Sequence, residues 1–225
     1  MSHISVALDG HSAAGKSTLA RKVARHYGFI YADTGALYRC IGLYALRNGV
    51  GSRDVQGVEK LLPEIKLEMK YDDDGMQRML LCGEDVTDCI RSPEASMYAS
   101  DVSAMPAVRE CLLSMQREIA EENDVIMDGR DIGTVVLPDA GLKVFITAEA
   151  GVRAKRRYIE LLERNIDTTL DEVEKELELR DKNDSERETA PLKVADDAIV
   201  LDTTKMDMDE SFDALRALIA GRFDL

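Results

Sequence analysis

The sequence predicts an α/β protein built on a doubly wound, five-stranded parallel sheet. Three observations support this fold class. Short apolar runs alternate with runs of helical spacing along most of the 225 residues, as expected for parallel strands joined through helices. A glycine-rich loop, residues 10–17, stands between the first apolar run and the first helical run. Polar loops that begin at Asp33 and Asp128 follow two further apolar runs, and ligands bind at such strand ends.

The first third of the chain contains two strand-then-helix units. Residues 4–8 predict a buried strand, and the apolar spacing behind the glycine-rich loop predicts a helix that ends at Gly28. Residues 29–31 predict a second strand. Helical spacing returns from Leu37 and stops at Asn48-Gly49. Two such units in succession favour a parallel sheet.

Residues 58–91 break this pattern, and we interpret them as a small inserted antiparallel subdomain. Residues 65–71 alternate between apolar and polar side chains, as a strand with one wet face does. Residues 72–75, Asp-Asp-Asp-Gly, predict a turn before a returning strand over residues 77–82. Three consecutive aspartates also suggest a metal site, but a solvated hairpin tip is the favoured interpretation.

The rest of the chain returns to strands and helices. Ser92-Pro93 and Met105-Pro106 each begin a helix, because proline fits the first helical turn. The remaining strands are predicted at residues 125–127, 142–146 and 198–201. Two charged helices lie between the last two strands, and the second begins with the capping box Thr169-x-x-Glu172. We therefore expect one domain, residues 1–225, with a mobile helical lid over residues 150–187.

The glycine-rich loop matches the phosphate-binding pattern G-x-x-x-x-G-K-[ST] in the strand–loop–helix setting that the pattern requires. Its glycines let several N–H groups converge, and the helix N-terminus favours a polyphosphate. Lys16 would reach the outer phosphates, and the Ser17 hydroxyl would bind Mg²⁺. The alternative is a glycine turn that only caps a helix. The match and its setting together predict a nucleoside triphosphate site.

Further candidates for chemistry follow the later strands. Asp128 ends an apolar strand and is suited to hold Mg²⁺, although an aspartate before glycine also forms plain turns. Arg130 and Arg39 are candidate phosphate clamps. The lid helices carry further charged residues, which by themselves are often only solvated: Arg153, Lys155, Arg156, Arg157, Arg180, Asp184 and Arg187. No Ser-His-Asp or Cys-His arrangement is visible, and an anionic acceptor oxygen would need no general base.

Composition limits the partners. The formal net charge of −14 argues against binding to long nucleic acids, whose affinity depends on neutralising many phosphates. No apolar run approaches the roughly 18 residues of a membrane span. The first residues lack the features of a signal peptide, so we expect a cytoplasmic protein. We also expect a monomer whose four cysteines are reduced and mostly packed as small apolar residues.

These motifs together resemble those of bacterial cytidylate kinases (CMP kinases), over essentially the whole chain. The resemblance rests on residues 10–18, 33–39, 128–134, 153–157 and 180–187, the last followed by Ala190-Pro191-Leu192. It implies a fold of the P-loop kinase type and transfer of the ATP γ-phosphoryl group to CMP or dCMP with Mg²⁺. The insert at residues 58–91 resembles the extra subdomain of bacterial members, on the monophosphate-binding side.

The resemblance also implies roles for individual residues. The ATP cradle would comprise Gly10, His11, Ser12, Ala13, Ala14, Gly15, Lys16, Ser17 and Thr18. The family's counterparts of Thr34, Arg39 and Arg130 approach the acceptor phosphate. Its counterparts of Ser100, Arg109, Asp131 and Arg187 frame the cytosine, and those of Arg180 and Asp184 lie at the ribose. The catalytic candidates are Lys16, Asp128, Arg130, Arg153 and Arg157, with Ser17 and Asp128 as metal ligands.

Two positions depart from the family pattern. Ala13 stands where glycine is common, in a part of the loop that we expect to tolerate it, and Asn183 stands where some relatives carry arginine. The proposed base contact is physically reasonable. Cytosine has an exocyclic amine that a carboxylate such as Asp131 can accept from, whereas uracil would leave polar groups unpaired at a cost of about 1–3 kcal/mol.

Three other functions remain as alternatives. A P-loop kinase for another acceptor would differ only in the acceptor pocket. A GTP-dependent switch is suggested by residues 204–207, which match the guanine-binding pattern [NT]KxD, but Asp128 lacks the D-x-x-G that such proteins carry. A non-catalytic module would bind ATP without transferring a phosphoryl group.

Overall fold

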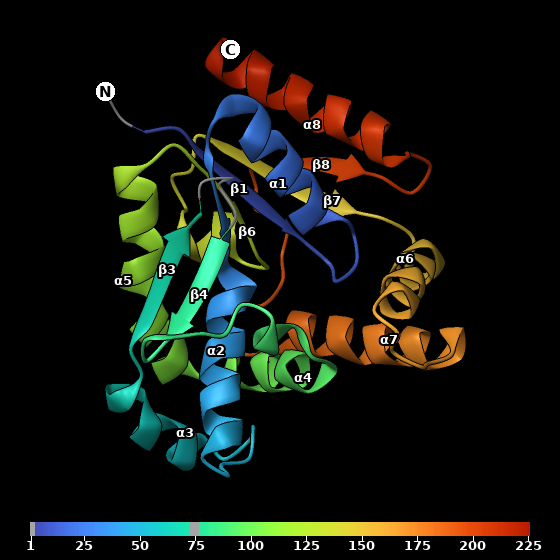
Figure 1. Cartoon of the computed structure of the whole chain (residues 1–225). Coiled ribbons are helices and arrows are strands. Elements are labelled where there is room, and N and C mark those ends of the chain that lie inside the picture. The colour runs from blue at the N-terminus through green and yellow to red at the C-terminus, as the bar shows by residue number, and fades with distance from the viewer. Residues whose placement is uncertain (1–2, 73–76) are drawn as a thin grey trace.

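The computed structural model describes residues 3–72 and 77–225. Its centre is a five-stranded parallel sheet in the order β2-β6-β1-β7-β8 (Figure 1). The strands are β1 (Ser5–Gly10), β2 (Ile30–Asp33), β6 (Val125–Asp128), β7 (Leu142–Thr147) and β8 (Ile199–Asp202). All neighbouring strands run parallel, which confirms the predicted doubly wound sheet.

Helices connect these strands. They are α1 (Lys16–Tyr27), α2 (Thr34–Arg47), α3 (Val55–Leu61), α4 (Pro93–Val102), α5 (Pro106–Glu122), α6 (Ala150–Glu163), α7 (Leu170–Glu186) and α8 (Met208–Phe223). Three short helices are η1 (Leu62–Glu64), η2 (Cys89–Arg91) and the π-helix η3 (Ile132–Val136), which the sequence pattern did not predict. The predicted helix starts at Pro93 and Pro106 and the capping box of α7 are confirmed.

The side chains of β1 alternate between two buried faces. Val6 and Leu8 pack in one apolar cluster with residues of α1 and α8. Ala7 belongs to another cluster, which includes Ile132 and Val136 of η3 and parts of α5. Helices therefore cover both faces of the sheet (Figure 1). Burial on both sides explains why the strand pattern at residues 4–8 is almost continuously apolar.

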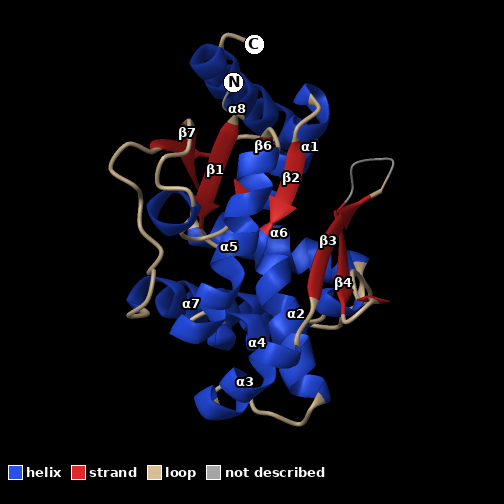
Figure 2. Cartoon of the chain, turned by 90° about the vertical axis from the view of Figure 1, so that its left-hand side faces the viewer, coloured by secondary structure: helices blue, strands red, loops and turns tan. Residues whose placement is uncertain are grey.

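The insert contains a three-stranded antiparallel sheet, β3 (Leu67–Tyr71), β4 (Gln77–Leu81) and β5 (Glu84–Asp85). The predicted hairpin is present, and the two-residue third strand was too short for a sequence pattern. The turn predicted at residues 72–75 falls, beyond Asp72, outside the described residues. Met79 and Leu81 share one apolar cluster with residues of α2, so the insert packs directly on that helix (Figure 2).

The two predicted lid helices, α6 and α7, pack on each other through a separate small cluster. Its buried members are Ala154, Leu161, Val173 and Leu177. Ala13 of the glycine-rich loop packs against this cluster. The lid thus shares little apolar surface with the sheet, although its movement stays a prediction.

The cysteines differ from the prediction. Cys40 is buried, but Cys82, Cys89 and Cys111 are exposed, so the expectation that most pack as small apolar residues is wrong. Cys82 lies in the tight β4–β5 turn with a φ of 51°, and Cys111 lies on the outer face of α5. None of the described helices combines the length and apolar character needed to cross a membrane.

Gln77 of β4 joins the insert to the central sheet. Strand β2 is an edge strand, so part of its backbone has no neighbouring strand to pair with. The side-chain oxygen of Gln77 accepts the N–H of Asp33 at 2.7 Å, and its nitrogen lies 3.4 Å from the Asp33 carbonyl oxygen. A side chain of the insert thus takes the place of the missing strand where β2 ends.

We predict that Gln77→Leu lowers the free energy of unfolding by about 1–3 kcal/mol, because it leaves the buried N–H of Asp33 without an acceptor. The control is Gln56→Leu on exposed α3, which should change stability by less than about 0.5 kcal/mol. Urea denaturation followed by circular dichroism measures both. Equal stability of the two variants would contradict the role assigned to Gln77.

Candidate active site

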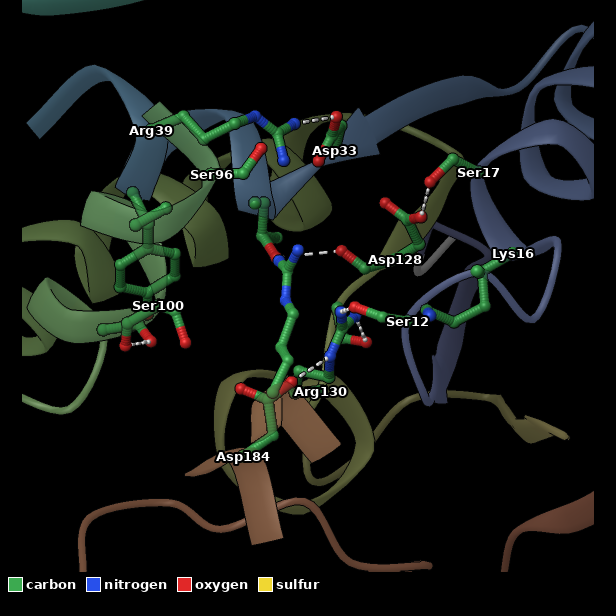
Figure 3. A pocket seen from close by; sticks show the side chains of 18 of the residues that line it. Ser12, Lys16, Ser17, Asp33, Arg39, Ser96, Ser100, Asp128, Arg130 and Asp184 are labelled. Carbon is green, nitrogen blue, oxygen red and sulfur yellow. Dashed lines mark hydrogen bonds and ion pairs between the residues drawn. The ribbon is translucent and has the colours of Figure 1, made fainter. Parts of the chain in front are cut away.

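A cavity of about 470 Å³ opens at the carboxyl edge of β1, β2 and β6. The glycine-rich loop, the start of α2, helix α4, the loop after β6 and the two helices α6 and α7 line most of it, and Arg91 of η2 and Arg109 of α5 complete the lining. Figure 3 shows Lys16 and Ser17 on one side of it, Arg39 and Ser100 on the other, and Arg130 between them. The three polar loops predicted to share one sheet edge do so.

The glycine-rich loop turns sharply where β1 meets β7. Gly10 has a φ of 143°, and a Cβ there would lie 2.0 Å from the carbonyl oxygen of Ile146. Only glycine fits this position. Ala13 has a φ of 58°, in the left-handed region that glycine adopts readily. The loop therefore accommodates alanine at residue 13, as expected, but in a backbone conformation that is strained for any residue with a Cβ.

Lys16 is buried at the start of α1, and its Nζ donates to the carbonyl oxygen of His11 at 2.7 Å. Burial, and next the charge of Arg130, lower the pKa of Lys16 to about 7. A polyphosphate bound in the loop would supply the counter-charge that this ammonium lacks. Within the loop, Ser12, Ala13, Gly15, Lys16, Ser17 and Thr18 line the cavity, while Gly10, His11 and Ala14 shape the loop from behind.

Two oxygen ligands meet at the base of the loop. The Ser17 hydroxyl donates to Oδ2 of Asp128 at 2.6 Å, and Tyr31 donates to Oδ1 at 3.2 Å. Burial, and next the charge of Asp33, raise the pKa of Asp128 to about 6. A hydroxyl and a carboxylate suit Mg²⁺, which usually takes one or two protein oxygens together with phosphates and water. These residues therefore fit the predicted metal.

The second loop carries Asp33, Thr34 and Arg39. Asp33 caps α2 by accepting the N–H of Ala36, and Nη2 of Arg39 donates to Asp33 at 2.6 Å. Nε of Arg39 has no hydrogen-bond partner among the described residues. The Thr34 hydroxyl donates to the carbonyl oxygen of Asp128 at 2.8 Å, so the second and third loops are fastened together.

The third loop presents Arg130. Its Nε donates to Asp184 of α7 at 2.8 Å, and its Nη2 donates to the Ser12 hydroxyl at 2.7 Å (Figure 3). One guanidinium thus connects the glycine-rich loop with the lid. A phosphoryl group moving between two ligands in this cavity would pass close to it.

Asp131 lies between two arginines. It pairs with Arg109 of α5 and, at 3.1 Å, with Nη2 of Arg187. Ser103 completes the group: its hydroxyl accepts from Arg187 at 3.2 Å, and its carbonyl oxygen accepts from Arg109 at 3.1 Å. The predicted Ser100 lines the cavity one helical turn earlier, and its carbonyl oxygen accepts from the Ser103 hydroxyl.

Positive charge exceeds negative charge in the cavity, although the chain is acidic. Among the described residues that line it are ten basic and seven acidic side chains. Arg180 is the clearest case of an unsatisfied donor, because its buried Nε has no hydrogen-bond partner within the described chain. Burial, and next the charge of Arg130, lower the pKa of Arg180 to about 10. Such a cluster is suited to an anionic ligand.

The arginines of α6 separate in the structure. Arg157 lines the cavity and pairs with Glu160 at 3.0 Å. Arg153 donates to the carbonyl oxygen of Ser12 at 3.1 Å and pairs with Asp181 at 2.7 Å, so it supports the loop from behind the cavity. Arg156 faces the segment after β8 and donates to the carbonyl oxygen of Thr203. These arginines are close in the sequence, but their side chains take three different places in the structure.

Sequence reasoning missed Asp9, Gln77 and Ser103. Asp9 is 5% exposed and accepts the N–H groups of Ile132 and Gly133, both at 2.8 Å. A charged residue within an apolar strand was the available signal for Asp9. Ser103 could have been found from its i, i+3 spacing to Ser100, whereas the contact of Gln77 depends on the position of the insert.

The guanine-like pattern at residues 204–207 has a structural explanation. Both Asp209 and Glu210 donate their N–H groups to the Asp207 carboxylate, which thereby caps α8. The carboxylate that would recognise guanine is thus already bound to the helix.

Comparisons with known proteins agree on one family. The family model for cytidylate kinase matches residues 6–220. A cytidylate kinase from Caldicellulosiruptor bescii is 49% identical over 210 residues, covering 93% of this chain and 92% of the relative. One from Streptococcus uberis is 48% identical over 204 residues, covering 91% and 90%.

Among solved structures, an uncharacterized protein from Eubacterium ventriosum ATCC 27560 superposes with a TM-score of 0.53. It is 14% identical in sequence, and the match covers 98% of this chain and 100% of that one. This likeness concerns the fold alone.

The two alanines in the glycine-rich loop should respond in opposite ways to the same substitution. Ala13→Gly removes left-handed strain and should stabilise the protein by about 1 kcal/mol. Ala14→Gly should destabilise it by about 1–2 kcal/mol, because Ala14 is buried and has no such strain. Urea denaturation tests the pair, and a loss of stability in both variants would show that Ala13 is not strained.

Proposed function

Because the chain belongs to the cytidylate kinase family, whose members are nucleoside monophosphate kinases that phosphorylate CMP with ATP, we propose that it acts on both CMP and dCMP with the help of Mg²⁺. The observation that carries this proposal is the pairing of a phosphate loop with guanidinium groups of Arg39 and Arg180 that keep a buried donor atom without a hydrogen-bond partner among the described residues, in one cavity. A donor polyphosphate and an acceptor phosphate together would balance those charges.

The donor side is supported by the glycine-rich loop. Backbone N–H groups of residues 10–18 would hold the phosphates of ATP, with Lys16 released from the His11 carbonyl oxygen to contact the outer phosphates. Ser17 and Asp128 would hold Mg²⁺. When bound, Mg²⁺ offsets negative charge on the phosphates during transfer.

The acceptor side is supported by the unpaired donor atom of Arg39 and by the Thr34 hydroxyl next to it. These groups and Arg130 would hold the monophosphate. Its oxygen is already anionic at neutral pH and attacks the γ-phosphorus in line, while the bond to the bridging oxygen of ADP breaks. No general base is needed. Positioning, together with charge neutralisation by Lys16, Arg130 and Arg157, supplies the catalysis. Arg153, a catalytic candidate from the sequence, lies behind the cavity and would instead position the glycine-rich loop.

Cytosine recognition is assigned to the group around Asp131. The carboxylate would accept from the exocyclic amine, with Arg109, Arg187 and Ser100 framing the rest of the base. Its two arginine partners already hold it in one orientation. Arg180 and Asp184 would lie at the ribose. None of the groups assigned to the phosphate or to the base needs a 2′-hydroxyl, so we include dCMP.

We assign roles to two segments of this single domain. Residues 58–91 would form a subdomain on the monophosphate-binding side, where Gln77 links them to the Asp33 loop. Residues 150–187 would close over the cavity as a lid, and the ion pair between Asp184 and Arg130 would hold them there. We further propose a cytoplasmic monomer that binds neither nucleic acid nor membranes, consistent with its net charge of −14.

Steady-state assays of ADP release test the function directly. With ATP and Mg²⁺, we expect CMP and dCMP to be phosphorylated in clear preference to UMP, AMP, GMP and shikimate. Lys16→Ala should abolish turnover while the circular dichroism spectrum stays unchanged, because the lysine supplies positive charge to the phosphates and is not needed for folding. Turnover led by AMP or GMP would refute the acceptor assignment.

Arg187→Ala should raise the KM for CMP about 10- to 100-fold, because hydrogen bonds to charged groups contribute ~1.5–3 kcal/mol. The KM for ATP should stay the same. Arg216→Ala on α8 is the control and should change neither value, because Arg216 does not line the cavity and its side chain is 42% exposed. An unchanged KM for CMP in Arg187→Ala would remove this residue from the acceptor pocket.

A further inference from the structure

Asp9 is a buried carboxylate that the proposed mechanism does not use. It does not line the cavity, and its side chain points from β1 to the opposite side of the sheet from Leu8. Its two oxygens each accept one backbone N–H, from Ile132 and Gly133, at 2.8 Å. Each oxygen therefore has a distinct partner, and both partners follow Asp131 directly in the chain.

Those two N–H groups begin the π-helix η3 (Ile132–Val136). Hydrogen bonds with the wide π spacing run from the N–H of Val136 to the carbonyl oxygen of Asp131 and from that of Leu137 to that of Ile132. Single π turns are rare and often occur at functional sites. This one begins at the carboxylate that we assign to cytosine.

The other end of η3 is held by Arg117 of α5. Its Nε donates to the carbonyl oxygen of Val136 at 3.0 Å, and its Nη2 donates to that of Val135 at 3.2 Å. A carboxylate thus binds the N–H end of the π-helix, and a guanidinium binds its carbonyl end. Helix ends favour this arrangement, with negative charge at the N-terminus and positive charge at the C-terminus. Asp9 is buried and Arg117 is exposed, so the first contact should be the stronger.

The direction of the Asp131 side chain depends on this arrangement. The carbonyl oxygen of Asp131 is bound within the first turn of η3, and the next two N–H groups are bound to Asp9. The backbone on the C-terminal side of Asp131 is therefore fixed. A shift of the turn would move the carboxylate away from Arg109 and Arg187, whose own positions depend on α5 and on the end of α7.

We propose that Asp9 and Arg117 are positioning residues that clamp the π-helix from both ends and thereby set the affinity and base selectivity of the acceptor site through Asp131. This inference rests on the proposed function, in that Asp131 contacts the acceptor base. The donor loop, which follows Asp9 in the chain, is fixed separately by the close approach of Gly10 to Ile146.

The first test is Asp9→Asn, which keeps the size of the side chain but turns one acceptor into a donor facing an N–H group. We expect the KM for CMP to rise about 10- to 100-fold, as when a reacting group is displaced by about 1 Å. The KM for ATP should change by less than about twofold. Asp124→Asn is the control, because this carboxylate also accepts a backbone N–H but lies at the opposite edge of the sheet.

A double-mutant cycle separates positioning from general loosening. Asp9→Asn should lower the ratio of kcat/KM for CMP to that for UMP in the wild-type background. It should leave that ratio unchanged, within about twofold, when Asp131→Asn is already present. An equal loss of selectivity in both backgrounds would overturn the proposal, because Asp9 would then act without Asp131.

Arg117→Gln keeps the test decisive if Asp9→Asn does not fold. Because Arg117 is exposed, this variant should fold and raise the KM for CMP about two- to fivefold, the size expected of a solvent-exposed charged contact, with the KM for ATP unchanged. The control is Arg216→Gln on α8. An unchanged KM for the acceptor, or equal rises for acceptor and donor, would overturn the proposal.

Failure of the proposed function would look different. A wild-type preference for another acceptor would refute the assignment of CMP, yet the comparison of acceptor KM with donor KM in these variants would still decide the role of Asp9 and Arg117. Conversely, if the wild-type protein phosphorylates CMP and the variants keep its KM values, only the proposed role of Asp9 and Arg117 would be refuted.

Discussion

The constraint on which the site depends is the burial of more guanidinium groups than the surrounding carboxylates can neutralise. Asp131 and Asp184 hold Arg109, Arg187 and Arg130 in place, but Arg180 retains an unpaired buried donor. Buried ion pairs add little net stability, because desolvation offsets the attraction. The cluster is therefore better explained by the anions it is arranged to receive. An acidic chain can gather this positive charge only where the fold concentrates it.

The same ion pairs preorganise the site. Asp33, Asp131 and Asp184 each restrict one or two arginines to a single orientation, so less side-chain freedom has to be lost when a nucleotide binds. Arg130 connects the two sides of the cavity, since it donates hydrogen bonds to Ser12 of the glycine-rich loop and to Asp184 of α7. The glycine-rich loop and α7 are thereby linked through one side chain.

Local rules explain what the sequence could predict. The sheet, the start of the donor loop and the caps of α4, α5 and α7 follow from periodicity, glycine and proline, which act over a few residues. The roles of Gln77 and Asp9 depend on residues 44 and more than 120 positions away, respectively. The π-helix has no local signal either. The family motifs predicted most of the cavity residues. A motif records which residues meet at a site, although it does not explain the distant contacts that bring them together.

Strand β1 positions both halves of the site by different means. Its chain continues into the donor loop, where Gly10 allows the close approach to β7. One residue earlier, Asp9 points to the other face of the sheet and binds the turn that follows Asp131. Since successive residues of a strand point to opposite faces, a shift of β1 by one residue would misplace the loop and the clamp together. The glycine-rich loop and the turn after Asp131 thus share one register, which would fix the separation of the proposed donor and acceptor sites.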